Sequence, residues 1–354
     1  MKMKKLSPAS RSGFINYAIV LVFFAVFQTL LSTGNLSNNF TGQLIPICAY
    51  VVMAISLNLV VGISGELSLG HAGFMSIGAF TGVIVSMSLQ SSVSSAPLRL
   101  LAAIVAGTLV AAVAGVIIGV PVLRLNGDYL AIVTLAFGEI IKNILNCLYV
   151  GVDGKGLHIS MKDANALNLD ENGLVILKGP MGATGITKLS GFVSGIILVL
   201  IALFIIQNFV NSRSGRAIKA IRDNRIAAEA SGLNVIKYKM MAFVISAAMA
   251  GAAGALYALN YSTVVPKKFD FNTSILILVF VVLGGIGNMR GSIISAAILT
   301  VLPELLREFR DYRMLIYAIV LILVMLITNN PSAKAFIHRI FGRRRDEDAE
   351  KGGA

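Results

Sequence analysis

The sequence is poor in charged residues and in cysteine. Charged residues make up 13% of its 354 residues and hydrophobic residues 56%, whereas a soluble globular chain carries about 25% charged residues. A soluble fold of this size could not bury so much apolar surface, which indicates lipid as the solvent. The two cysteines, Cys48 and Cys147, both lie inside apolar runs. Two such residues exclude a disulfide framework and a paired-cysteine metal site, and we expect both in the core.

The sequence also lacks the motifs of common catalytic sites. It contains no G-x-x-x-x-G-K-[ST] phosphate loop, no H-E-x-x-H pair and no nucleophile elbow. We therefore predict that the chain is not an enzyme and that it binds no cofactor or metal of its own. The net charge of +13 would suggest nucleic acid in a soluble protein. Here the Lys and Arg residues lie mainly between apolar runs, where they orient a membrane protein, so we expect a lipid bilayer and no nucleic acid.

Long apolar runs dominate the chain. A membrane-spanning helix needs about 20 mostly apolar residues. Ten segments approach this length: 14–32, 44–62, 68–88, 98–121, 129–150, 190–210, 240–260, 273–289, 291–308 and 312–329. The third, rich in Gly and Ser, either crosses or enters and returns. We expect an all-α integral membrane protein of about ten transmembrane or re-entrant helices.

The distribution of Lys and Arg predicts the orientation. Most of them fall on the side that holds the N-terminus, the connection 211–239 and the C-terminal tail. The richer side is expected to be cytoplasmic. We thus predict a cytoplasmic N-terminus over 1–13, a membrane domain over 14–329 and a basic, disordered cytoplasmic tail over 330–354. The first segment has no A-x-A cleavage site near its end and is predicted to be a retained helix rather than a signal peptide.

The longest outer connection, 151–189, is polar and rich in Gly, with no clear strand or helix period. Two interpretations stay open for it, a docking surface for a partner and a solvated connector.

The inner connection 212–239 is charged and built of good helix formers. Ala217, Ile218, Ile221 and Ala228 form an apolar stripe near helical spacing, and Gly232 is a plausible helix stop. This predicts a short helix on the cytoplasmic face. The helix either meets a protein partner or lies on anionic lipid.

Ionisable groups inside or beside apolar segments are costly in lipid and usually face a cavity, a neighbour or an interface. Glu66 and His71 flank the third segment, Asp128 opens the fifth, and Glu139 lies within the fifth. We consider these four as candidates for a translocation path. Each has a structural alternative. Glu139 is three residues from Lys142, and the two can neutralise each other. His71 can be a buried, hydrogen-bonded histidine, and Glu66 and Asp128 can lie at the inner interface.

Small residues at helical spacing, Gly78–Gly82, Gly115–Gly119 and Gly287–Gly291, indicate faces where helices pack closely. Asn58, in an otherwise apolar segment, is expected to form a hydrogen bond between helices.

Four separated blocks carry a resemblance to a known family. Gly215–Val235 (GRAIKAIRDNRIAAEASGLNV) resembles the cytoplasmic coupling segment of ABC importer permeases of the branched-chain amino acid and ribose group. Three further blocks resemble the LivM type of the branched-chain amino acid branch: Gly65–Phe80 (GELSLGHAGFMSIGAF), Leu123–Ile140 (LRLNGDYLAIVTLAFGEI) and Val281–Leu299 (VVLGGIGNMRGSIISAAIL). The chain departs from the family pattern after the fifth segment, where Val150-Gly151-Val152-Asp153-Gly154 replaces a Thr-Gly-Gly stretch.

The resemblance implies the ABC importer permease fold and import of branched-chain amino acids across the cytoplasmic membrane of a prokaryote. It implies a second permease chain, two ATP-binding subunits that use the ATP, and an extracytoplasmic substrate-binding protein. It also implies contact with the ATPase by residues of the coupling segment: Gly215, Arg216, Asn224, Ala227, Ala228, Glu229 and Gly232. For Glu229 and Gly232 the alternative is that they only cap and end a helix.

Other functions fit the same sequence. One is the same machine for another small solute, such as urea, another amino acid or a monosaccharide. Another is a channel or a secondary transporter driven by an ion gradient, which needs acidic groups at mid-membrane and no ATPase. A third is a membrane scaffold that transports nothing.

Overall fold

The structure, a computed structural model, describes residues 8–34, 38–90, 92–124, 128–154, 156–170, 173–306, 312, 315, 318, 319 and 322. For residues 8–12, 38–39 and 128 it describes the backbone alone. The chain forms two compact units, Met1–Ala297 and Ile298–Ala354, and the arrangement given below is that of the first. The predicted tail 330–354 lies outside the described residues.

The described residues are mostly helical. The α-helices are α1 (Pro8–Ser32), α2 (Asn38–Asn58), α3 (His71–Ser88), α4 (Ala96–Val122), α5 (Asp128–Cys147), α6 (Phe192–Asn211), α7 (Arg213–Asp223), α8 (Arg225–Ala230), α9 (Val235–Ala258), α10 (Phe271–Gly284) and α11 (Met289–Leu305). A π-helical segment, η1 (Leu59–Ser64), continues α2. Short 3-10 turns lie at Asn165–Leu167, Gly179–Met181 and Pro266–Lys268.

Seven described helical segments are long and apolar enough to cross a membrane, which does not confirm the expected count of about ten. They are Gly13–Ser32, Phe40–Ser64, His71–Ser88, Ala96–Val122, Tyr129–Cys147, Phe192–Asn211 and Val235–Ala258. The expected eighth segment is α10, whose 14 residues reach only about 21 Å at 1.5 Å per residue. The tenth, 312–329, falls almost wholly outside the described residues. The third is one continuous helix of 18 residues, α3, so no re-entrant turn occurs within it.

The core is built around α2 and around close contacts of α3 and α4 with α9. A Cβ atom on Gly78 of α3 would lie 2.0 Å from the carbonyl oxygen of Gly251 in α9, and one on Gly254 would lie 1.9 Å from that of Met75. Gly82 and Gly115 likewise face alanines of α9. The predicted close-packing faces on α3 and α4 are thus confirmed. The Gly287–Gly291 pair is different, because Gly287 lies in the turn before α11 with φ +83°.

The two cysteines differ in burial. Cys48 is buried in α2, as expected, and lies beside Gly195 of α6. Cys147, the last residue of α5, is exposed, so the expectation of a core position for it was wrong. The local cause is its place at the helix end, where the chain leaves the bundle.

The connection 151–189 contributes to a β-sheet, so the described chain is mostly helical rather than all-α as expected. The strands are β1 (Tyr149–Asp153), β2 (Gly156–Ser160), β3 (Leu174–Lys178), β4 (Ala183–Thr184) and β5 (Thr263–Val264). They pair antiparallel in the order β2-β1-β3-β4-β5. Strands of two to five residues interrupted by glycines give little period, and β5 comes from beyond α9.

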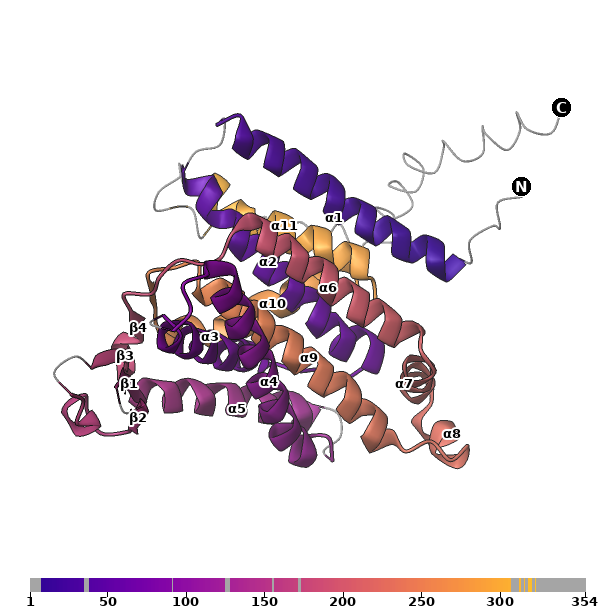
Figure 1. Cartoon of the computed structure of the whole chain (residues 1–354). Helices are drawn as coiled ribbons and strands as arrows, with labels where there is room; N and C mark the ends of the chain where they lie inside the picture. The colour runs from indigo at the N-terminus through magenta and orange to yellow at the C-terminus, as the bar shows by residue number, and fades with distance from the viewer. Residues whose placement is uncertain are drawn as a thin grey trace. The chain divides into compact units, whose positions relative to one another are not determined.

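The sheet and the helix pair α7–α8 lie at opposite ends of the helical bundle (Figure 1). Helices α6 and α9 each connect the two ends. Helix α1 runs antiparallel to α6, since Phe24 stacks near Phe192 at the start of α6, with ring centroids 5.6 Å apart, and Gly13 lies beside Gln207 near its end. The start of α1 therefore shares the end of the bundle that carries α7 and α8.

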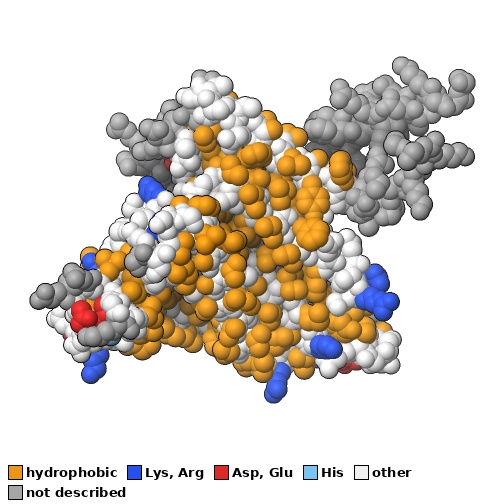
Figure 2. All heavy atoms as spheres, viewed as in Figure 1, with side chains coloured by type: hydrophobic (Ala, Val, Ile, Leu, Met, Phe, Trp, Pro, Cys, Tyr) orange, Lys and Arg blue, Asp and Glu red, His pale blue; other side chains and the backbone are white. Residues whose placement is uncertain are grey.

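The surface agrees with burial in lipid. On the face seen in Figure 2, hydrophobic side chains cover the middle of the bundle and charged side chains gather at its margins. Helices α1, α4 and α5 carry many of the exposed large apolar residues: Phe14, Leu21, Val22, Leu98, Leu101, Leu109, Ile117, Tyr129, Ile132 and Ile140. Such a contiguous apolar surface requires lipid or protein as its neighbour.

We predict that Gly78→Ala destabilises the protein and that Gly42→Ala does not. The added methyl group at Gly78 meets backbone atoms of α9, which costs about 1–3 kcal/mol. Gly42, also helical, has nothing within 4 Å of its Cβ position. Thermal unfolding of both variants in detergent, followed by size-exclusion chromatography of a fluorescent fusion, measures the difference. Equal melting temperatures would show that the α3–α9 contact is looser than described.

Candidate coupling and translocation site

The inner connection folds as two short helices rather than the one expected. Ser212 caps α7, accepting a hydrogen bond from the Gly215 N–H at 3.2 Å. The chain turns at Asn224, which is extended and whose side-chain oxygen accepts from the Ala227 N–H at 3.0 Å, so that α8 begins there. Asn234 caps α9 in the same way. Asparagine and serine favour such caps, so each break is encoded locally. The connection ends at Asn234, five residues before the expected boundary.

Gly232 ends α8 as predicted. Its φ is +82°, a left-handed conformation that glycine adopts without strain. The Gly232 N–H donates to the Glu229 carbonyl at 2.9 Å and the Leu233 N–H donates to the Ala228 carbonyl at 3.1 Å. These two bonds form a Schellman motif, which satisfies the last carbonyls of the helix.

The predicted apolar stripe holds the helix pair on the bundle. Ile221 of α7, Ala228 of α8 and Val235 of α9 form a buried cluster, covered by Leu233 and Tyr238. The orientation of α8 is thus set by packing against its two neighbours.

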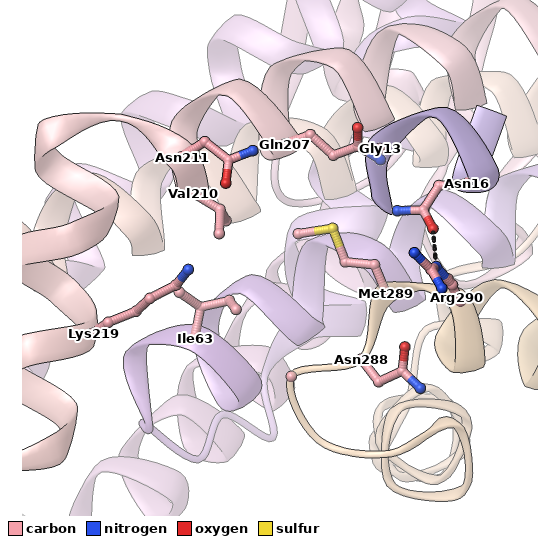
Figure 3. A pocket seen from close by; sticks show the side chains of 11 residues that line it. Gly13, Asn16, Ile63, Gln207, Val210, Asn211, Lys219, Asn288, Met289 and Arg290 are labelled. Carbon is pink, nitrogen blue, oxygen red and sulfur yellow. Dashed lines mark hydrogen bonds between the residues drawn. The ribbon is translucent and has the colours of Figure 1, made fainter. Parts of the chain in front are cut away.

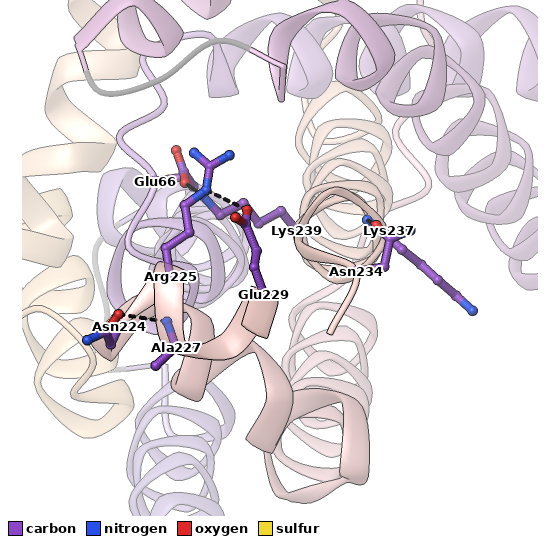
Figure 4. Close-up of polar contacts among 8 residues, drawn as sticks. All are labelled: Glu66, Asn224, Arg225, Ala227, Glu229, Asn234, Lys237 and Lys239. Carbon is purple, nitrogen blue, oxygen red and sulfur yellow. Dashed lines mark hydrogen bonds and ion pairs between the residues drawn. The ribbon is translucent and has the colours of Figure 1, made fainter. Parts of the chain in front are cut away.

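The seven predicted coupling residues divide by exposure. Gly215 and Ala228 are buried, and a Cβ on Gly215 would lie 2.3 Å from the Val210 carbonyl oxygen. The others are exposed: Arg216, Asn224, Ala227, Glu229 and Gly232. Figure 4 shows Glu229 paired with Arg225, at 3.0 Å between Nε and Oε1. Between them Ile226 is 80% exposed, which leaves an apolar side chain at the tip of the helix pair.

Arg222 ties this helix pair to the membrane-buried part of the chain. Its guanidinium Nη1 donates to the carbonyl oxygen of Gly62 at 2.6 Å. Gly65 lies against the same side chain, with φ +75°. Gly62 belongs to η1, so α7 contacts the end of the central helix directly. The sequence analysis missed Arg222, because a side-chain bond to a distant backbone carbonyl leaves no residue pattern.

Asn58 connects η1 to the α10–α11 turn. Its Nδ2 donates to Ser292 Oγ at 2.9 Å and its Oδ1 accepts from the Gly287 N–H at 2.8 Å. The hydrogen bond between helices expected for Asn58 is confirmed. The end of α2, the coupling helices and the α10–α11 turn therefore form one hydrogen-bonded assembly.

Non-helical backbone follows η1, with Gly65 and Leu67 exposed and Ser68 and Gly70 buried. Between Gly65 and Gly70 the chain has no helix, and α3 starts only at His71. The Leu69 N–H donates to Thr134 Oγ1 of α5 at 3.0 Å, and the Ala72 N–H donates to Ser274 Oγ of α10 at 3.2 Å. A Cβ on Gly70 would lie 2.0 Å from the Thr134 carbonyl oxygen. The end of this break therefore packs against α5, and the start of α3 packs against α10.

The four predicted path residues do not gather at one place. His71 is 2% exposed and its Nε2 lies 2.8 Å from Ser56 Oγ, which is the buried, hydrogen-bonded alternative. Glu66 forms an ion pair with Lys239 of α9. Glu139 pairs with Lys142 on one helical face, as expected. The side chain of Asp128 lies outside the described residues.

A small crevice lies at the break. It measures about 10 Å³ and is lined by Leu69, Gly73, Gly138, Glu139 and Asp270, among others. This volume admits no amino acid. The described part of the chain also brings no three His, Cys, Asp or Glu residues together as a metal site would require.

Comparison with known proteins decides the family. The family model described as "Branched-chain amino acid transport system / permease component" matches residues 39–325. The chain belongs to this family. Members are permease components of ABC transporters, which are not themselves enzymes, and the seven candidate spans fit a multi-pass membrane protein.

Relatives agree with the family. The high-affinity branched-chain amino acid transport system permease protein LivM of Salmonella typhimurium is 36% identical over 286 residues, covering 78% of this chain and 66% of the relative. The chain therefore spans just under two thirds of that protein. The ribose import permease protein RbsC of Escherichia coli is 26% identical over 319 residues, covering 88% and 91%. The permease protein LivH of Salmonella typhimurium is 32% identical over 134 residues, covering 37% and 43%. No solved structure was found to match significantly.

We predict that Arg222→Ala loosens η1. The substitution leaves the Gly62 carbonyl without its charged donor, an interaction of about 1.5–3 kcal/mol. Hydrogen–deuterium exchange of peptides covering 58–66 should rise in the variant. Arg225→Ala is the matched control, since its exposed pair with Glu229 contributes less than about 1 kcal/mol. Unchanged exchange in both variants would mean that the Arg222 contact does not hold η1.

Proposed function

We propose that the chain is the membrane-spanning permease subunit of an ATP-driven importer of branched-chain amino acids. The observation that carries this proposal is the helix pair α7–α8, which is exposed at one end of the bundle and bonded through Arg222 to the end of the central helix. Such a helix pair would transmit a partner's movement to the partly buried break at Gly65–Gly70.

The proposed partner at α7–α8 is a pair of ATP-binding subunits, which would use the ATP. The contact surface consists of the exposed members of the predicted set together with Ile226. Ile226, an apolar side chain that is 80% exposed between charged neighbours, offers an apolar contact to a partner. Gly215 and Ala228 support this surface from within, because they are buried.

The proposed orientation places α7–α8 and the start of α1 in the cytoplasm of a prokaryote, with the sheet outside. The end of the bundle that carries α7 and α8 is rich in cations: Arg213, Arg216, Lys219, Arg222, Arg225, Lys237 and Lys239. Cytoplasmic connections carry such an excess. The sheet at the other end exposes Leu157, Ile159 and Leu174, which supports docking of an extracytoplasmic substrate-binding protein over a solvated connector.

A second permease chain is proposed to complete the translocation path. Within the described chain the break is closed to a crevice of about 10 Å³. The path therefore needs residues of a second chain to line it, and exposed apolar residues of α4 and α5 offer a contact surface for that chain. The likeness to LivH, a permease named for the same system as LivM, supports a homologous but different partner.

We expect uptake of labelled leucine to depend on this gene in a strain without another leucine importer. Excess isoleucine and valine should block uptake, depletion of ATP should abolish it, and a proton uncoupler should leave it. Block by ribose or urea instead would reassign the solute within the same mechanism. Loss of uptake with the uncoupler alone would overturn the ATP-driven mechanism in favour of an ion-coupled transporter.

We expect Gly232→Leu to abolish transport while the protein still reaches the membrane. A leucine at φ +82° is strained by about 1–2 kcal/mol and distorts the end of α8. Nothing lies within 4 Å of the Cβ position, so the fold itself has room for the side chain. Gly232→Asn is the control, because asparagine tolerates the left-handed conformation. Normal uptake by the leucine variant would remove Gly232 from the coupling machinery.

A further inference from the structure

A polar cavity of about 380 Å³ lies beside the coupling helices (Figure 3). Its walls come from the start of α1, η1, the end of α6, α7 and the α10–α11 turn. The volume is in the range of sites for small ligands. Of the residues expected to meet the ATPase, none lines it within the described chain.

The cavity carries positive charge. Lys219 of α7 and Arg290 of α11 both line it, and no Asp or Glu is found among its described lining residues. Arg290 is held in place by the buried Asn16, with Nε 3.0 Å from Oδ1. The positive end of the α11 dipole and the negative end of the α6 dipole both face the cavity, so their fields there offset each other. The field inside comes mainly from the two cationic side chains.

Gln207 adds an unpaired donor. Its side chain is 91% buried, since 9% remains exposed. Its Nε2 is buried without a hydrogen-bond partner among the described residues. Figure 3 shows this amide at the α1 wall, beside Gly13. A buried amide N–H without a partner costs about 1–3 kcal/mol, so a ligand acceptor would stabilise this site.

The cavity lies beside an exposed apolar surface of the bundle. Helix α1 is its outer wall, and Phe14, one residue from the cavity, is 70% exposed. The neighbouring α7–α8 connection is charged and lies at the end of the bundle. A negatively charged group carried at the membrane surface could thus enter beside α1. Basic pockets between transmembrane helices at this level bind phosphate head groups.

We propose that this cavity binds the phosphate group of an anionic ligand, held by Lys219, Arg290 and the amide of Gln207. The ligand would bridge α1, α6, α7 and the α10–α11 turn. It would therefore hold the coupling helix against the membrane domain. This inference does not depend on which solute is transported.

Thermal stabilisation of the purified full-length chain tests the proposal. The protein is placed in nanodiscs of phosphatidylcholine, with and without added phosphatidylglycerol, and separately in phosphatidylcholine with added inorganic phosphate. Lys219→Gln and Gln207→Leu remove a charge and the unpaired donor, respectively. Lys237→Gln is the matched control, because Lys237 is exposed on α9 outside the cavity. Arg290→Lys keeps the charge and should retain most of the effect.

We expect phosphatidylglycerol to stabilise the protein. Its apparent affinity should be about fivefold weaker for Lys219→Gln and unchanged for Lys237→Gln. Stabilisation by inorganic phosphate alone, with the same dependence on Lys219 and Gln207, would support the site but assign it to a soluble anion. Equal responses of all variants, or no response to either anion, would overturn the proposal.

Discussion

The structure depends on one constraint: buried peptide groups that leave a helix must find hydrogen-bond partners within the protein. The chain leaves helix at Gly65 and resumes it at His71. Thr134 accepts from the Leu69 N–H, Ser274 accepts from the Ala72 N–H, and Arg222 donates to Gly62 just before the break. Because these partners come from α5, α10 and α7, the break and the residues next to it contact three helices.

The same hydrogen bonds allow the break to change conformation when a neighbouring helix moves. A hydrogen bond inside a helix is one of a repeating series, whereas the bond of Arg222 to the Gly62 carbonyl is a single contact that can break without disrupting a helix. Movement of α7 would pull on Gly62 through Arg222, and Asn58 would carry that movement to Gly287 and Ser292. The α7–α8 pair and the α10–α11 turn are therefore connected by contiguous contacts, and these contacts are candidates for two arrangements.

Sequence was sufficient where a local rule decides the structure. Length and apolarity locate α1 to α6, Gly232 stops α8, Asn58 makes its bond between helices, and the spacing of Glu139 and Lys142 predicts their pair. It failed where long-range pairing decides. The sheet unites strands on both sides of α9, and Arg222 bonds a backbone atom 160 residues away. It also grouped Glu66 and His71 as path residues because both flank one segment, although one faces Lys239 and the other Ser56.

The two halves of the fold differ in how they can move. Helices α3, α4 and α9 touch through glycines, with backbone against backbone, and such contacts allow no side-chain adjustment. They form a rigid body. The opposite side, around η1 and the α10–α11 turn, is joined by amides, hydroxyls and a guanidinium. A displacement of α7 would reach the rigid body through the buried cluster of Ile221, Ala228 and Val235. It would reach η1 and the α10–α11 turn through Arg222. The relative displacement must then be taken up at Gly65–Gly70, where the two sides join and no helix resists it.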